Sequence, residues 1–107
     1  MKYIEIKTNI DDLNKAKIIS NRLLEKHLIA SSNIIQVETI YNKNNKQQEY
    51  KEYMIIMKTT IYLYKKIEEE ILNLHTYELP EISYHEITGH EKYLKWIDDE
   101  TKQIKEI

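Results

Sequence analysis

The chain has 107 residues, a length that suits one domain, and we expect a single domain over residues 1–107. Its 16 Lys and Arg against 18 Asp and Glu give a formal net charge of −2, which argues against nucleic acid as a partner because phosphates require a basic face. Since the chain has no cysteine, a disulfide framework, a thiolate metal site and a cysteine nucleophile are excluded. No apolar run approaches the length of a membrane span, so we expect no membrane partner and a cytoplasmic location.

A strand and then a helix are predicted at the start of the chain. Residues 2–8 alternate, with Ile4 and Ile6 on one face, as in a half-buried strand. Apolar residues then recur at helical spacing to about His27. Thr8 or Asn9 is the expected cap of this helix.

Two long strands follow, over about 29–41 and 49–58, with a polar hairpin tip over 42–48. Both strands are apolar on two faces near one end, so each is expected to be covered twice. One cover is helix and the other is a candidate subunit contact. The residues expected on that second face are Ile34, Ile40, Met54 and Ile56.

The rest of the chain predicts a helix, a short strand and a last helix. Thr59 or Thr60 is the expected cap of a helix that ends near His75, ahead of Pro80. A strand over about 81–87 and a helix over about 91–102 come next. The expected inner face of the last helix consists of Tyr93, Leu94 and Ile97, with Trp96 beside it.

This order of elements is typical of the ferredoxin-like βαββαβ plan, with an extra C-terminal helix. The expected fold class is therefore α+β: a four-stranded antiparallel sheet with two helices on one face. The plan carries many functions and does not by itself select one.

Several segments of the chain form recognisable motifs. The most specific are the block from His75 to Ile82 and the later Tyr93-Leu94-x-Trp96. Supporting segments are Lys58-Thr59-Thr60, Leu28–Ile34, Ile40-Tyr41 and Gly89. Together these segments, over about residues 8–101, resemble the CutA family of divalent-cation tolerance proteins.

The resemblance implies a tight homotrimer joined through its sheets, a role named from cation sensitivity, and copper binding in some members. Copper-binding relatives place a cysteine at the end of the first strand and a His pair at the end of the second helix. The matching positions here are Lys7, Leu74 and His75, so one ligand of three is retained. The family usually has Trp where this chain has Lys43 and Gly where it has Asn45.

His75 is thus the candidate metal ligand, for copper(II) or another divalent cation. The alternative interpretation is a helix cap, with the ring near the last carbonyls. The chain has no paired-histidine spacing typical of a metal site. We therefore expect metal binding to be weak.

A small-ligand pocket between subunits is the other candidate site. Its residues would supply a cation, carboxylates, an imidazole and amphipathic aromatics. They are Glu52, Lys58, His75, Tyr77, Glu78, Tyr93 and Trp96. The alternative is that Tyr77, Tyr93 and Trp96 are interface packing. The runs Glu68–Glu70 and Asp98–Glu100 are interpreted as solvated helix faces.

The sequence therefore predicts a non-enzymatic, CutA-like trimer that acts in divalent-cation tolerance. It offers no nucleophile partnered with a base. The alternative function is a trimeric regulator that senses a small metabolite in clefts between subunits, as the similarly folded PII signalling proteins do.

Overall fold

A computed structural model describes residues 2–103 of the chain. The elements run in the predicted order, with a 3₁₀ turn over Ile61–Leu63 ahead of the second helix. The strands are β1 (Tyr3–Ile10), β2 (Ser31–Lys43), β3 (Lys46–Thr60) and β4 (Ser83–Ile87), and the helices are α1 (Leu13–Glu25), α2 (Tyr64–Leu74) and α3 (Glu91–Glu100).

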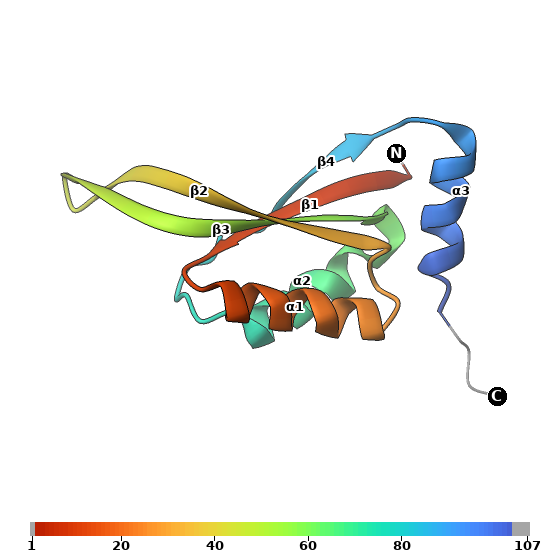
Figure 1. Ribbon diagram of the computed structural model, residues 1–107, viewed down its shortest axis with the longest axis horizontal. Helices are drawn as coiled ribbons and strands as arrows, with labels where there is room; N and C mark the ends of the chain where they lie inside the picture. The colour runs from red at the N-terminus through yellow and green to blue at the C-terminus, as the bar shows by residue number, and fades with distance from the viewer. Residues whose placement is uncertain (1, 104–107) are drawn as a thin grey trace.

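The four strands form one antiparallel sheet in the order β2-β3-β1-β4. Helices α1 and α2 lie side by side against one face of this sheet, and α3 stands at the end opposite the β2–β3 hairpin (Figure 1). The predicted α+β fold, with its ferredoxin-like sheet and extra C-terminal helix, is confirmed.

The core lies between the sheet and helices α1 and α2. Ile4 and Ile6 of β1 are fully buried there, as is Met57 of β3. Leu23 of α1 and Ile71 of α2 close the core from the helix side. Each such side chain contributes about 1.5–3 kcal/mol through burial, so these two helices hold the sheet mainly by apolar packing.

Strand β3 outruns β1 by several residues. The pairing of β1 with β3 ends at Ile10 and Tyr53, whereas the pairing of β2 with β3 continues to Lys43 and Lys46. Residues 37–52 therefore form a two-stranded ribbon, here called the arm, which projects beyond the helices (Figure 1). Glu52 is the one buried residue of this ribbon.

The turn of the arm is shorter than predicted. Asn44 and Asn45 have φ angles of 53° and 63°, so two residues in the left-handed region close the hairpin. The polar segment 42–48 was expected to be a loop, but most of it pairs across the strands. The expectation was wrong because polarity reflects exposure here, and asparagine tolerates positive φ.

Two predicted helix caps are also corrected. Thr8 and Asn9 lie inside β1, which runs to Ile10, and the cap of α1 is Asp12, whose carboxylate accepts a hydrogen bond from Lys15 N at 3.0 Å. Thr60 precedes the 3₁₀ turn without a side-chain cap bond. Thr59 is fully buried, and its hydroxyl donates to the Leu28 carbonyl at 2.6 Å.

The predicted second face mixed residues from both sides of the sheet. Ile34 pairs with Ile55 and packs against the helix-covered core, whereas Met54 pairs with Ile35 and belongs to the face without helices. Ile40 falls in the row of Ile34. The face of each strand was predicted correctly, but the register between strands decides which faces match, and single-strand periodicity does not contain it.

Candidate functional site

A polar cluster forms where α2 ends against β1. His75 is the C-terminal cap residue of α2, and its backbone turns extended there. The ring Nε2 lies 2.8 Å from the Asn9 carbonyl oxygen, and the Tyr77 backbone N–H donates to Nδ1 at 3.1 Å. Because Nδ1 accepts, the proton resides on Nε2, which donates to Asn9. Burial lowers the pKa of His75, which favours this neutral tautomer.

Tyr77 connects this cluster to the sheet. Its hydroxyl donates to Glu52 Oε2 at 2.5 Å, and its ring meets the His75 ring edge-on at 4.8 Å between centroids. Glu52 is only 6% exposed, so the hydroxyl supplies a partner that its buried charge requires. Burial, reinforced by the Glu52 hydrogen bond, raises the pKa of Tyr77, so the phenol stays protonated at neutral pH.

Asn9, Glu52 and Tyr77 of this cluster also line a cleft at the base of the arm. The cleft has a volume of about 1060 Å³ and is lined by the arm, the end of β1 and the segment between α2 and β4. Its acidic residues are Asp11, Glu52, Glu78 and Glu81, and its tyrosines are Tyr41, Tyr50 and Tyr77. Lys43 also lines it.

Lys58 lies away from this cleft. It pairs with Glu5 of β1 at 3.2 Å, and His85 of β4 approaches the same carboxylate at 3.8 Å. Lys58 and Glu52 are six positions apart on β3, which corresponds to about 20 Å along a strand. The structure therefore places Lys58 in a charged row across the helix-free face.

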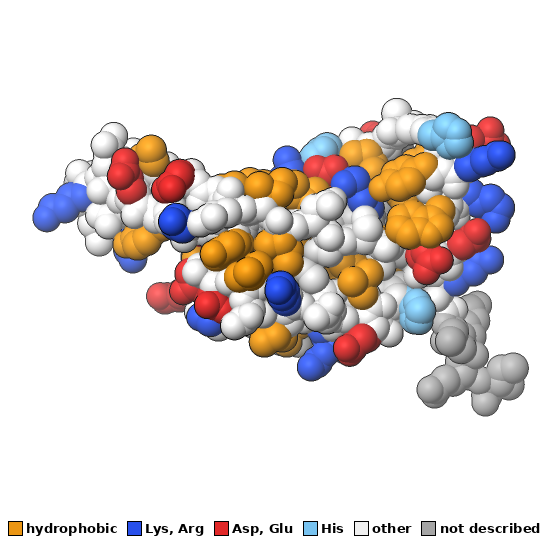
Figure 2. Space-filling view, viewed as in Figure 1, with side chains coloured by type: hydrophobic (Ala, Val, Ile, Leu, Met, Phe, Trp, Pro, Cys, Tyr) orange, Lys and Arg blue, Asp and Glu red, His pale blue; other side chains and the backbone are white. Residues whose placement is uncertain are grey.

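Tyr93 and Trp96 form a third group, on α3. Their rings stack with centroids 5.8 Å apart, and they are 39% and 40% exposed. Hydrophobic side chains accordingly lie on the surface over α3 (Figure 2). The expectation that Tyr93 belongs to the inner face was wrong, because Ile97 alone fills the buried position and Leu94 is half-buried.

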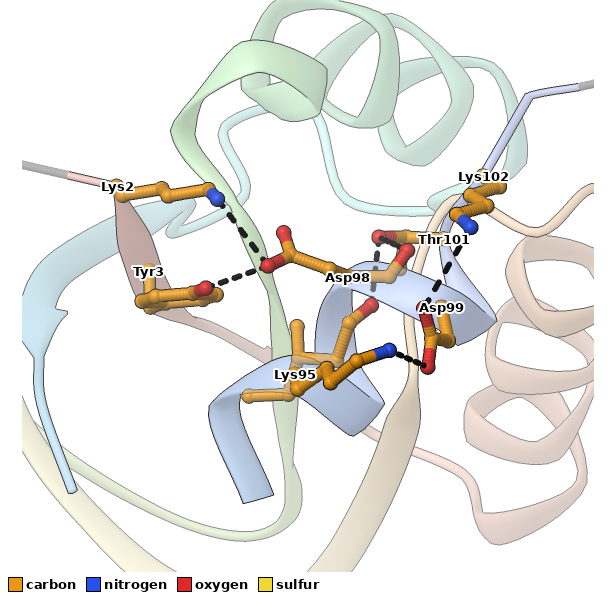
Figure 3. Close-up of polar contacts among 8 residues, drawn as sticks. Lys2, Tyr3, Lys95, Asp98, Asp99, Thr101 and Lys102 are labelled. Atoms are coloured by element: carbon orange, nitrogen blue, oxygen red, sulfur yellow. Dashed lines mark hydrogen bonds and ion pairs between the residues drawn. The ribbon is translucent and has the colours of Figure 1, made fainter. Parts of the chain in front are cut away.

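An anchor of α3 was missed by the sequence analysis. Asp98 accepts hydrogen bonds from the Tyr3 hydroxyl at 2.5 Å and from Lys2 Nζ at 3.1 Å, which fixes α3 to the start of β1 (Figure 3). The Tyr3 hydrogen bond, assisted by Lys2, lowers the pKa of Asp98. Because Asp98 belongs to an acidic run, it was interpreted as a solvated face. The sequence pattern could not reveal this contact, because Tyr3 of β1 lies 95 residues away from Asp98 in the chain.

The polar cluster does not present a ready metal site. Both ring nitrogens of His75 are engaged in hydrogen bonds, so metal ligation would require one of them to break. Within residues 2–103, no three His, Asp or Glu side chains converge in a geometry that could hold a metal ion. The described part of one chain therefore does not fit a copper site. Nor does any helix in that part have the length and apolarity to cross a membrane.

The split βαβ sheet, its projecting arm and the extra C-terminal helix define a ferredoxin-like α+β domain. Residues 4–100 match the family described as CutA1 divalent ion tolerance protein. The chain therefore belongs to the CutA1 family, which confirms the resemblance seen in the sequence.

Individual relatives agree with this assignment. The divalent-cation tolerance protein CutA of Pyrococcus horikoshii is 34% identical over 101 residues, or 94% of this chain and 99% of the relative. The solved CutA1 structure from Ehrlichia chaffeensis has a TM-score of 0.89 at 30% identity, covering 95% of this chain and 98% of its own. The periplasmic CutA from Archaeoglobus fulgidus has a TM-score of 0.91 at 29% identity, covering 94% and 99%.

Proposed function

We propose that this protein acts in tolerance of divalent cations, as one domain over residues 1–107, without catalysis. The observation that carries the proposal is the family match over residues 4–100, together with relatives named for divalent-cation tolerance.

The proposed working unit is a homotrimer. Two-stranded ribbons are marginally stable in water, yet the arm extends over residues 37–52 with one buried residue. The face without helices carries Ile35, which is 48% exposed, beside half-buried Met54 and Ile56. Hydrophobic side chains are visible along the middle of the molecule (Figure 2). A symmetric assembly that covers this face would stabilise the arm.

Copper(II) binding by this protein is proposed to be weak, because the retained His75 is already hydrogen-bonded through both nitrogens. A titration of the metal-free protein with copper(II), repeated on His75→Ala, tests this. Submicromolar affinity that the variant loses would contradict weak binding.

The proposed role is tested in cells that lack their own CutA-family gene. We expect this chain to restore growth in raised copper(II), relative to the empty vector and to a sodium chloride control at equal ionic strength. Unchanged copper sensitivity at full expression would refute the role. Fractionation of the same cells tests the proposed cytoplasmic location, and light scattering of the purified protein tests the trimer.

A metabolite-sensing regulator is the second candidate function. The observation in its favour is the cleft at the base of the arm, whose volume of about 1060 Å³ suits a small molecule. Calorimetric titration with a panel of nucleotides tests it, and saturable binding with one nucleotide per chain would favour sensing over tolerance.

A further inference from the structure

We propose that the assembly of this protein is sensitive to pH, through the charged row on the helix-free face that consists of Lys58, Glu5 and His85. The inference rests on the proposed homotrimer, in which a neighbouring subunit covers that face. Covering the row removes its charges from water, and the balance of those charges depends on whether His85 carries a proton.

The charged row runs directly across three strands. The strand register places Glu5 of β1 opposite Lys58 of β3 on one side and opposite His85 of β4 on the other. Successive side chains of a strand alternate between the two faces of a sheet. Because Ile4 and Ile6 are buried in the core, Glu5 and its two cross-strand neighbours lie on the face opposite α1 and α2 (Figure 1).

Glu5 is already neutralised by Lys58. The Lys58 ammonium lies 3.2 Å from Glu5 Oε2, and the two side chains are only 18% and 17% exposed within a single chain. His85 Nε2 lies 3.8 Å from Glu5 Oε1, which is beyond hydrogen-bond distance, and its side chain is 52% exposed. Neutral His85 therefore leaves the row with one positive and one negative charge, whereas a proton on His85 leaves it with an uncompensated positive charge.

The other titratable groups near the row do not offset that charge. Lys7 faces the same side of β1 and adds another positive charge. Tyr3 faces that side too, but its hydrogen bond to Asp98 raises the pKa of Tyr3, so the phenol is neutral. The Asp98 carboxylate is paired with Lys2. The residues that flank His85 on the same face of β4 are uncharged.

Covering the face makes the extra charge costly. Burial disfavours a charged group unless an opposite charge compensates it, and the carboxylate beside His85 is shared with Lys58. Assembly therefore favours neutral His85, whereas a free chain accepts the proton on a side chain that is half in water. Histidine changes charge between about pH 5 and pH 8, so this linkage operates near neutrality. A fall in pH is thus expected to dissociate the trimer.

The test is light scattering of the full chain over a dilution series at about pH 7.5 and about pH 5.5. The concentration at half-dissociation should rise about tenfold at the lower pH, because each chain binds a further proton when it is released. His85→Gln cannot bind that proton, so the rise should fall to less than about twofold. His85→Lys keeps a positive charge and should weaken assembly at both pH values. Far-UV circular dichroism of each sample separates dissociation from unfolding.

His90→Gln is the matched control, because His90 is an exposed histidine at the N-terminal cap of α3, outside the charged row, and it should keep the wild-type response. A trimer whose dissociation ignores pH, or an equal response in wild type and His85→Gln, would overturn this inference and leave the proposed trimer standing. A response that disappears in His75→Gln instead would also overturn it. A wild-type protein that is monomeric at both pH values and at every concentration would overturn the trimer and this inference together.

Discussion

The two ends of the β2–β3 hairpin differ sharply in how they are stabilised. Near β1, residues such as Ile55 and Met57 are completely buried under α1 and α2. In the arm, the same two strands continue in unbroken register, but Ile40 is 62% exposed and Tyr50 is 47% exposed. Backbone pairing alone thus extends the strands, while burial decides which end is stable within one chain. The base is expected to fold on its own, and the arm to depend on a partner.

The largest effect is expected in the base. Ile71→Ala removes a fully buried side chain of α2 and should lower the free energy of unfolding by about 2–5 kcal/mol through lost burial and the remaining cavity. Urea unfolding at fixed protein concentration measures it. Ile40→Ala in the arm is the control and should cost less than about 0.5 kcal/mol. If Ile71→Ala and Ile40→Ala lowered the free energy of unfolding equally, the base and the arm would not differ in stability as proposed.

The next effect concerns assembly. Ile35→Asp places a charge on the helix-free face and should shift the protein toward smaller species, by about 2 kcal/mol or more per interface. Ile40→Asp puts the same charge on the opposite face of the same strand and should shift assembly less. Light scattering over a dilution series compares the two. If the wild-type protein is a monomer at every concentration, the proposal that a neighbouring subunit covers the arm is wrong.

A pH effect is expected at the junction of base and arm. The folded-state pKa of His75 lies below its ordinary value, so the unfolded chain binds the proton first as pH falls. The contribution of neutral His75 is present above about pH 6.5 and is lost as pH falls through the lower folded-state pKa. Wild type should therefore lose more stability than His75→Gln between pH 7 and pH 5 in urea unfolding. Parallel profiles would contradict this assignment.

The smallest effect is expected at the tip of the arm. Asn45 has a φ of 63°, which glycine adopts without steric cost, so Asn45→Gly should change stability by no more than about 0.5 kcal/mol. Asn45→Ala should cost about 1 kcal/mol, since alanine resists that conformation. Thermal unfolding distinguishes the pair. If alanine were tolerated as well as glycine, the two-residue turn would not hold in solution.

The sequence predicted elements well where the pattern is local. Ile4 and Ile6 predicted a strand, because their alternation reports the burial of one face directly. Sequence analysis failed where the contacting residue lies far away in the same chain. Lys58 was predicted to line the pocket, but it forms an ion pair with Glu5. Asp98 was predicted to face solvent, but it accepts a hydrogen bond from the Tyr3 hydroxyl. Among the candidate pocket residues, Glu52, His75, Tyr77 and Glu78 lie together, while Lys58, Tyr93 and Trp96 lie elsewhere.

The place of β1 between β3 and β4 has a consequence for biosynthesis. A ribosome releases β1 first, but its neighbours are Lys46–Thr60 and Ser83–Ile87, which emerge much later. Until then, Ile4 and Ile6 have no strand beside them, and at about 5–20 residues per second that interval lasts for seconds. The hydrogen bond from Tyr3 to Asp98 forms later still. The nascent chain therefore exposes these apolar side chains of β1 during synthesis, and a chaperone could bind them at that stage.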